Sequence, residues 1–113
     1  MVKVMLAVLN ACADETRLRL LNLLAGSREM CVSDLVEAIG TSQPKVSRHL
    51  AYLRRSQLVR ERKEGLHVYY RLATVAECSA RPVVDAILDW LDDSESPPVE
   101  STPSEPALSI ELL

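Results

Sequence analysis

The chain has 113 residues, of which 48% are hydrophobic, and a formal net charge of −3. This length gives one small domain that is marginal as a lone monomer, so we expect an oligomer. The first residues match neither a signal peptide nor a membrane span, and an odd number of cysteines without export features argues against a disulfide framework, so we expect a cytoplasmic protein with free thiols.

The first part of the chain carries three predicted helices. Residues 2–12 have apolar side chains at helical spacing, more of them than a surface helix needs, which favours a dimer face. Asp14 is a good N-cap for a second helix, which Gly26 ends. A third, short helix is predicted at residues 33–39, and Gly40 supplies its stop.

A fourth helix is predicted at residues 42–55. Thr41 or Ser42 can cap it, and Pro44 is tolerated because it lies in the first turn, where its missing N–H is not needed. A short helix, a glycine-containing turn and a second helix with a basic exposed side form the helix-turn-helix pattern. The inward face of the fourth helix carries Val46, Leu50 and Leu53.

Two strands and one further helix complete the predicted domain. Residues 58–63 and 66–72 alternate in character around a Glu-Gly turn, which predicts a hairpin that would form a wing. Thr74 can cap a last helix, in which Pro82 forces a late start or a kink. This helix resembles a second dimer helix, since its side chains repeat at apolar spacing. The apolar stripe consists of Val84, Ile87, Leu88 and Leu91.

Charge divides the chain into a basic part and an acidic end. Residues 1–81 hold all thirteen Lys and Arg and eight acids, whereas residues 82–113 hold eight acids and no base. The end of the chain is also rich in proline and serine and low in hydrophobicity, which predicts disorder. We place the folded domain at residues 1–92 and a disordered acidic tail at residues 93–113.

These elements predict a mainly α fold with a small β-hairpin, a winged helix-turn-helix, assembled as a homodimer. Residues 41–72 carry eight of the thirteen basic residues against two acids. Their charge lies on an element shaped for a DNA groove and the phosphates beside it, so a DNA-binding regulator is the leading hypothesis. The alternatives are a solvated basic face, or a module that binds a protein partner.

The side chains expected at the DNA belong to the first turns of the fourth helix and to the wing. Gln43 suits adenine and Arg48 suits guanine through bidentate hydrogen bonds, whereas Lys45 suits phosphate. For His49, a contact with the protein scaffold is an equal alternative. The candidate DNA-binding residues are Ser42, Gln43, Lys45, Ser47, Arg48 and His49 of the helix and Arg62 and Lys63 of the wing.

Four runs of sequence carry a resemblance to a known family. They are ADETRL at 13–18, MCVSDL at 30–35, SQPKVSRHLAYLR at 42–54 and GLHVYYRL at 65–72. In this order they resemble the ArsR/SmtB winged-helix repressors, particularly the arsenic-responsive branch. The resemblance implies a homodimer built from the first and last helices, which binds a palindromic operator and leaves it when an inducer binds.

The resemblance also implies an inducer site near the third helix. In the arsenic branch the matching segment commonly reads C-V-C-D-L-C, whose soft thiolates bind trivalent arsenic or antimony. Here Cys31 takes the first cysteine position, whereas Ser33 and Val36 take the second and third. The expected inducer is arsenite or antimonite bound through Cys31. The alternative is an oxidant or another soft ligand at the same thiol.

The remaining cysteines and the acids of the last helix offer further candidate sites. Cys12 and Cys78 lie on elements expected at the dimer interface, as a second thiol site or as small hydrophobic residues. No histidine follows His67, and Asp85 with Asp89 supplies only hard ligands, so we expect no zinc site on the last helix. The sequence contains no phosphate loop, nucleophile–histidine arrangement or paired carboxylates in an apolar pocket, so we expect no enzymatic activity.

Overall fold

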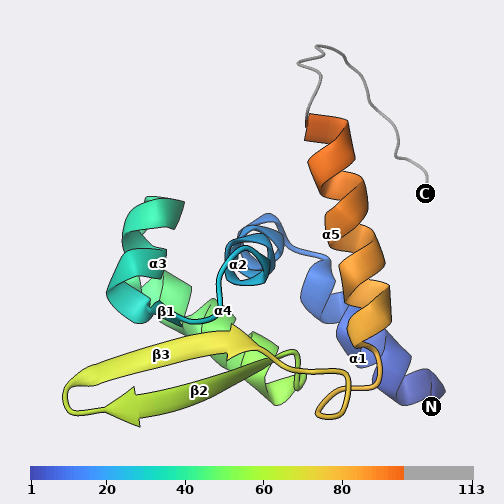
Figure 1. Ribbon diagram of the computed structural model, residues 1–113, viewed down its shortest axis with the longest axis horizontal. Coiled ribbons are helices and arrows are strands. Elements are labelled where there is room, and N and C mark those ends of the chain that lie inside the picture. Colours follow the sequence, from blue (N-terminus) through green and yellow to red (C-terminus); the bar gives the residue numbers. More distant parts are fainter. Residues whose placement is uncertain (96–113) are drawn as a thin grey trace.

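The computed structural model describes the backbone of residues 1–95 and the side chains of residues 1–91 (Figure 1). Over this range, helices and a three-stranded sheet form a winged helix, which confirms the predicted fold class. The predicted tail lies outside the described residues, except that residues 93–95 end the last helix. The elements are α1 (Val2–Cys12), α2 (Glu15–Ala25), β1 (Met30–Cys31), α3 (Val32–Ile39), α4 (Gln43–Arg55), β2 (Val59–Glu64), β3 (His67–Leu72) and α5 (Arg81–Glu95).

Capping residues in the sequence set several helix boundaries. The Asp14 carboxylate accepts a hydrogen bond of 3.0 Å from the backbone N–H of Arg17 and begins α2. Gly40 ends α3 with a φ of 79°, a left-handed conformation that glycine adopts without strain. The Ser42 hydroxyl accepts a hydrogen bond of 3.4 Å from the N–H of Lys45 at the start of α4. These caps and this stop confirm the predictions made from the sequence.

The wing is a β-hairpin extended by a short third strand. β2 and β3 pair antiparallel along their whole length, up to Glu64 opposite His67. β1 pairs with the other edge of β3 and places Cys31 opposite Tyr69. The sequence does not predict β1, because two residues are too few to show an alternating pattern. This pairing holds the start of α3 beside the wing.

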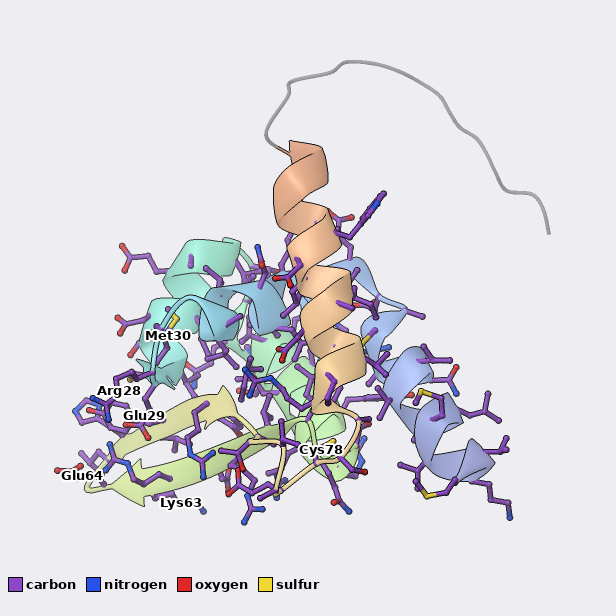
Figure 2. The ribbon with its side chains drawn as sticks, turned by 45° about the vertical axis from the view of Figure 1, so that its right-hand side comes forward. Arg28, Glu29, Met30, Lys63, Glu64 and Cys78 are labelled. Carbon is purple, nitrogen blue, oxygen red and sulfur yellow. The ribbon has the colours of Figure 1, made fainter. Side chains whose placement is uncertain are left out.

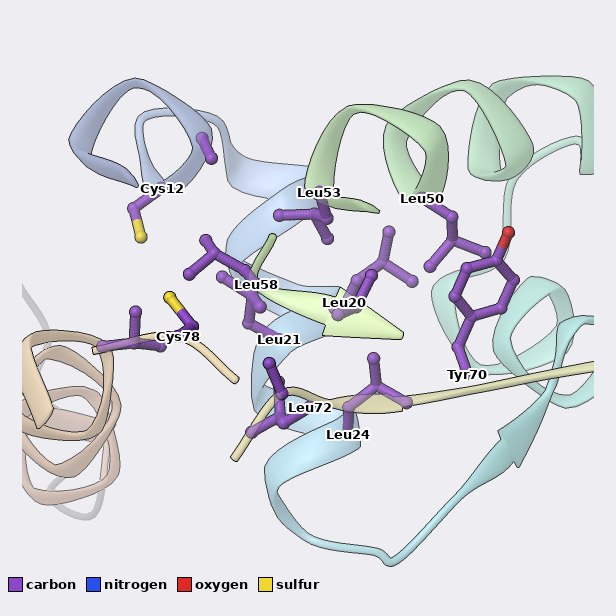
Figure 3. Close-up of a cluster of buried hydrophobic side chains, with 14 of the residues drawn as sticks. Cys12, Leu20, Leu21, Leu24, Leu50, Leu53, Leu58, Tyr70, Leu72 and Cys78 are labelled. Carbon is purple, nitrogen blue, oxygen red and sulfur yellow. The ribbon is translucent and has the colours of Figure 1, made fainter. Parts of the chain in front are cut away.

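The hydrophobic core joins α2 and α4 to the base of the wing (Figure 3). Leu20 and Leu21 of α2 and Leu50 and Leu53 of α4 are all fully buried. Figure 3 shows these leucines facing one another, with the Tyr70 ring of β3 beside Leu50. Burial of one face of α4 leaves the opposite face of this helix at the surface.

The last helix starts later than a cap at Thr74 predicts. Thr74 and Glu77 exchange side chain to backbone hydrogen bonds of 2.9 and 3.2 Å, but these close a turn, and α5 begins at Arg81. Of the two effects predicted for Pro82, the late start is observed. Arg71 holds the Glu77 carboxylate through two hydrogen bonds of 2.8 and 2.9 Å, which lowers the pKa of Glu77 to about 2. The wing is thereby tied to the segment before α5.

α1 and α5 lie on the side of the molecule away from the tip of the wing (Figure 1). α1 buries Val8 and Ala11 but leaves Val2 74% exposed and Leu6 53% exposed. On α5, the side chain of Trp90 is 67% exposed. Within residues 1–95, no helix is long and apolar enough to cross a membrane.

Candidate nucleic-acid interface

The exposed face of α4 carries polar and basic side chains in its first two turns. Every third or fourth position of this helix is apolar and buried, as at Val46 and Leu50, which are 0% exposed. The positions between them therefore point away from the core. The predicted DNA-binding residues exposed at the N-terminal end of α4 are Ser42, Gln43, Lys45, Ser47 and Arg48.

Some basic residues of α4 and the wing form ion pairs within the protein, and others do not. Lys45 and Arg48 of α4 and Lys63 near the tip of the wing form no ion pair with any residue that the structure describes. All three are exposed. An unpaired, exposed cation can contact phosphate or a base edge without first breaking a contact within the protein.

Arg62 belongs to the wing as predicted, but its guanidinium is held within the protein. It donates hydrogen bonds of 3.0 and 2.7 Å to the Glu29 carboxylate and also pairs with Glu64. It lies 4.6 Å over the ring of Tyr69. The same pairing lowers the pKa of Glu29. Figure 2 shows Glu29 and Glu64 at the same end of the molecule, where the loop before β1 meets the wing.

His49 faces the scaffold rather than the exposed face of α4. Its side chain is only 18% exposed, and its Nδ1 atom lies 3.3 Å from the guanidinium of Arg17 and 3.8 Å from the carboxylate of Asp14. Arg17 also lies 4.0 Å over the ring of Tyr52. This corresponds to the second of the two interpretations of His49 from the sequence, a contact with the scaffold.

Arg17 is a structural residue of this interface that sequence reasoning does not identify. Its guanidinium donates hydrogen bonds of 2.7 and 3.1 Å to the carbonyl oxygens of Ala11 and Asn10 in the last turn of α1. Together with its contacts to α4, these bonds connect the first helix to the recognition helix. Arg17 lies in the ADETR run that the sequence singles out, but its partners on α4, His49 and Tyr52, lie more than thirty residues further along the chain.

We expect Arg17→Ala to lower the free energy of unfolding by about 2–4 kcal/mol, because several hydrogen bonds from one charged donor are lost together. Arg19→Ala is the matched control in the same helix. Arg19 is 61% exposed and pairs only with Glu15 among the described residues, so its loss should change stability by less than about 1 kcal/mol. Urea unfolding at fixed protein concentration measures both, and equal effects would contradict the structural role of Arg17.

Cys31 lies at the start of α3, half-buried beside the wing. Its Sγ atom is 3.1 Å from the hydroxyl of Ser33 and 4.0 Å from Nδ1 of His67. The hydrogen bond with the Ser33 hydroxyl lowers the pKa of the Cys31 thiol, so more of it is thiolate at a given pH. A pocket of about 260 Å³ opens here, lined by Cys31 and by Gln43 and Ser47 of α4. The predicted inducer residue thus borders the predicted DNA-binding residues.

The other two cysteines are buried within one chain. Cys12 and Cys78 are each 7% exposed and belong to the hydrophobic core. Figure 3 shows their side chains pointing toward one another. Burial raises the pKa of the Cys12 thiol, which favours its protonated, unreactive form. Their surroundings match the alternative in which both are small hydrophobic residues.

A buried scaffold, an exposed basic recognition helix and a wing define a winged-helix DNA-binding protein. Residues 14–61 match the model of the bacterial regulatory protein arsR family. The arsenic resistance transcriptional regulator ArsR1 of Pseudomonas putida is 42% identical over 88 residues, which cover 74% of this chain and 69% of that protein. The chain belongs to the ArsR family. A family of transcriptional regulators agrees with the prediction that the chain is not an enzyme.

Further relatives support this membership. The arsenical resistance operon repressor of Escherichia coli is 49% identical over 73 residues, covering 65% of this chain and 62% of that protein. Among solved structures, HlyU of Vibrio cholerae matches 81% of this chain and 91% of its own, with a TM-score of 0.67 and 34% identity. The AntR antimony-specific transcriptional repressor matches 82% of this chain and 81% of its own, with a TM-score of 0.67 and 28% identity.

Proposed function

We propose that this chain is a homodimeric transcriptional repressor that binds operator DNA through α4 and the wing and leaves it when an inducer binds near Cys31. The observation that carries the proposal is the surface of α4. Its buried leucines fix the helix on the scaffold, and its first turns present Gln43, Lys45 and Arg48 to solvent. An α-helix presented in this way fits the major groove of DNA.

The proposed dimer uses α1 and α5. Val2 and Leu6 of α1 and Trp90 of α5 are large apolar side chains at the surface. A second copy of the chain would cover this apolar area and add the core that a small domain lacks. Two recognition helices related by a twofold axis match a palindromic operator whose half-sites are about 34 Å apart.

The proposed DNA contacts fall into two groups. Gln43 and Arg48 are proposed to read base edges, and Ser42 and Ser47 lie beside them on α4. Lys45 and the wing residue Lys63 are proposed to contact phosphates. Arg62 and His49, whose side chains contact the protein itself, are proposed to hold the wing and α4 in position.

The proposed inducer is a thiophilic species that binds the Cys31 thiolate, and arsenite is the first to be tested. The support is the partial exposure of this thiol, its pKa, which the Ser33 hydroxyl lowers, and the arsenic or antimony named for several relatives. Gln43 and Ser47 line the same pocket. A ligand there would need only about 1–3 kcal/mol of coupling to lower operator affinity by one or two decades.

Arsenite should release the wild-type chain from its operator and should leave Cys31→Ser bound, because a hydroxyl cannot replace a thiolate for a soft ligand. Fluorescence anisotropy of the reduced protein on DNA from upstream of its own gene measures this. Cys78→Ala, which removes a buried thiol of the core, is the control and should respond as the wild type does. Release of Cys31→Ser by arsenite would place the inducer elsewhere.

Oxidation of Cys31 is the second candidate signal. The thiol is half-exposed and its pKa is lowered, two properties of cysteines that react with oxidants. Hydrogen peroxide in the same anisotropy assay distinguishes this signal. Release by peroxide, but not by arsenite, and restoration by a thiol reductant would identify a redox-responsive repressor.

A further inference from the structure

The wing and the proposed dimer helix α5 are joined by a loop. Figure 1 shows β3 running into this loop and α5 leading away from the sheet. The loop consists of residues 73–80, which form neither helix nor strand. Ala73, Cys78 and Ala80 are buried and attach it to the core. Burial of apolar surface is not directional, so it attaches the loop without fixing the orientation of α5 relative to the wing.

Two arginines bridge this loop with directional contacts. Arg71 of β3 donates hydrogen bonds of 2.8 and 2.9 Å to the two carboxylate oxygens of Glu77 in the loop. Arg81 begins α5 and donates a hydrogen bond of 2.7 Å to the carbonyl oxygen of Ala73, directly after β3. It donates another of 2.7 Å to the Asp85 carboxylate, one turn further along α5. These bridges link the end of β3 to the start of α5.

Glu77 is held in one position by its neighbours. Its carboxylate accepts a hydrogen bond of 2.9 Å from the backbone N–H of Thr74, and its own N–H donates one of 3.2 Å to the Thr74 hydroxyl. Arg60 of β2 lies 4.0 Å from the same carboxylate, so both long strands of the wing contribute a cation to it. The paired geometry of an arginine and a carboxylate also fixes their relative orientation.

The pair of Arg71 and Glu77 is partly shielded from water. The side chain of Glu77 is 26% exposed and that of Arg71 is 37% exposed, whereas both partners of the Glu15–Arg19 pair on α2 are more than 60% exposed. Ion pairs with less exposure are screened less by salt. Arg71 also lowers the pKa of Glu77 to about 2, so the carboxylate keeps its charge at neutral pH. The bridge therefore persists under the conditions in which DNA is bound.

We propose that Glu77 is a positioning residue that transmits the orientation of α5 to the wing and thereby sets the half-site spacing that the dimer accepts. This inference rests on the proposed function, because it needs a dimer formed through α1 and α5 and a wing that contacts DNA. A fixed loop makes each wing turn together with its dimer helix. A loosened loop lets each DNA-binding unit turn by itself.

Half-site spacing is a sensitive measure of this orientation. One base pair added between two half-sites turns one of them by about 35° and moves it by about 3.4 Å relative to the other. A dimer with fixed DNA-binding units cannot follow this change without losing contacts at one half-site. A dimer whose units turn independently can follow it, although it binds the natural spacing less tightly because it must be ordered on the DNA.

The test compares the wild type with Glu77→Gln, which keeps the size of the side chain and removes the charge that Arg71 binds. Fluorescence anisotropy is measured on the palindrome from upstream of the chain's own gene and on duplexes one base pair shorter and one longer between the half-sites. We expect the wild type to bind both altered duplexes at least about tenfold more weakly, and Glu77→Gln to bind all three within about threefold of one another.

Glu15→Gln is the matched control, because it removes the same charge from an exposed ion pair with Arg19 at 2.6 Å. It should keep the spacing preference of the wild type. Arg71→Gln is a second variant of the pair, and the double variant Arg71→Gln/Glu77→Gln should show the same loss of preference as either single variant, since the two side chains act as one unit.

Urea unfolding and sedimentation equilibrium separate positioning from a purely structural role. The DNA titrations are made at a temperature and concentration at which each variant is folded and dimeric. A structural role alone lowers the free energy of unfolding but leaves the spacing preference of the folded dimer unchanged. Loss of the dimer in both Glu77→Gln and Arg71→Gln would show that the pair builds the dimer instead of orienting the wing, and would overturn the inference.

The outcomes also separate this inference from the proposed function. If the wild type binds the operator and Glu77→Gln keeps the full spacing preference, the inference is wrong and the proposed function stands. If the wild type binds none of the three duplexes, both are wrong. Loss of the spacing preference in Glu77→Gln and Arg71→Gln, but not in Glu15→Gln, is the result that supports the inference.

Discussion

Arg48→Ala should lose at least about 30-fold in affinity for the operator while the fold stays intact. Arg48 is exposed on the free face of α4 and has no ion-pair partner among the described residues. A bidentate contact from arginine to guanine contributes about 1–3 kcal/mol of discrimination, and a dimer loses two such contacts at once. Fluorescence anisotropy with operator DNA and with a scrambled duplex of equal length measures both affinity and preference.

Arg54→Ala is the control for the charge change in the Arg48 experiment. Arg54 belongs to the last turn of the same helix, and its guanidinium lies 4.0 Å from the Glu61 carboxylate. Its loss should weaken binding to both duplexes slightly and equally, because it lies far from the groove-facing end of α4. If Arg48→Ala keeps the wild-type preference for the operator, Arg48 does not read the DNA sequence.

Leu50→Ala should lower the free energy of unfolding by about 2–5 kcal/mol, the usual cost of truncating a fully buried leucine. Leu50 is 0% exposed and fixes α4 to the core beside Tyr70 (Figure 3). This loss is a large part of the total stability of a small domain, so operator binding at 37 °C should fall as well. Urea unfolding monitored by circular dichroism, at one fixed protein concentration, measures the change.

Ser47→Ala is the control at an exposed position one turn earlier in α4. Ser47 is exposed, so its replacement should change stability by no more than about 0.5 kcal/mol. A destabilisation of Leu50→Ala no larger than that of Ser47→Ala would mean that the buried face does not hold the recognition helix on the scaffold.

Local signals in the sequence are sufficient to predict the helices that form the scaffold. The helix ends at Asp14, Gly40 and Ser42 depend only on neighbouring residues. Asp14 and Ser42 accept hydrogen bonds from nearby backbone N–H groups, and Gly40 adopts a left-handed backbone conformation. The buried stripe of α4 is likewise visible as periodic leucines and valine. By contrast, β1 is not predictable, because its two residues become a strand only through pairing with β3, which lies about forty residues further along the chain.

The roles of individual charges depend on partners that are distant in sequence. Arg62 and Lys63 are neighbours in the wing and equally basic, yet Glu29 holds Arg62 across 33 residues while Lys63 stays unpaired among the described residues. His49 is turned to the scaffold by Arg17, which lies 32 residues earlier. Composition and motif identify the basic surface as a whole. Only the fold separates the side chains that are free to contact DNA from those that hold the surface together.

The most direct test of the account is the salt dependence of binding to DNA from upstream of the chain's own gene. If Lys45 and Lys63 of both protomers contact phosphate, the logarithm of affinity should fall with the logarithm of salt concentration with a slope of about −4, at two chains per palindrome. The double variant Lys45→Ala/Lys63→Ala should flatten this slope. A slope near zero, or equal affinity for operator and scrambled DNA, would contradict a dimer that binds its operator through α4 and the wing.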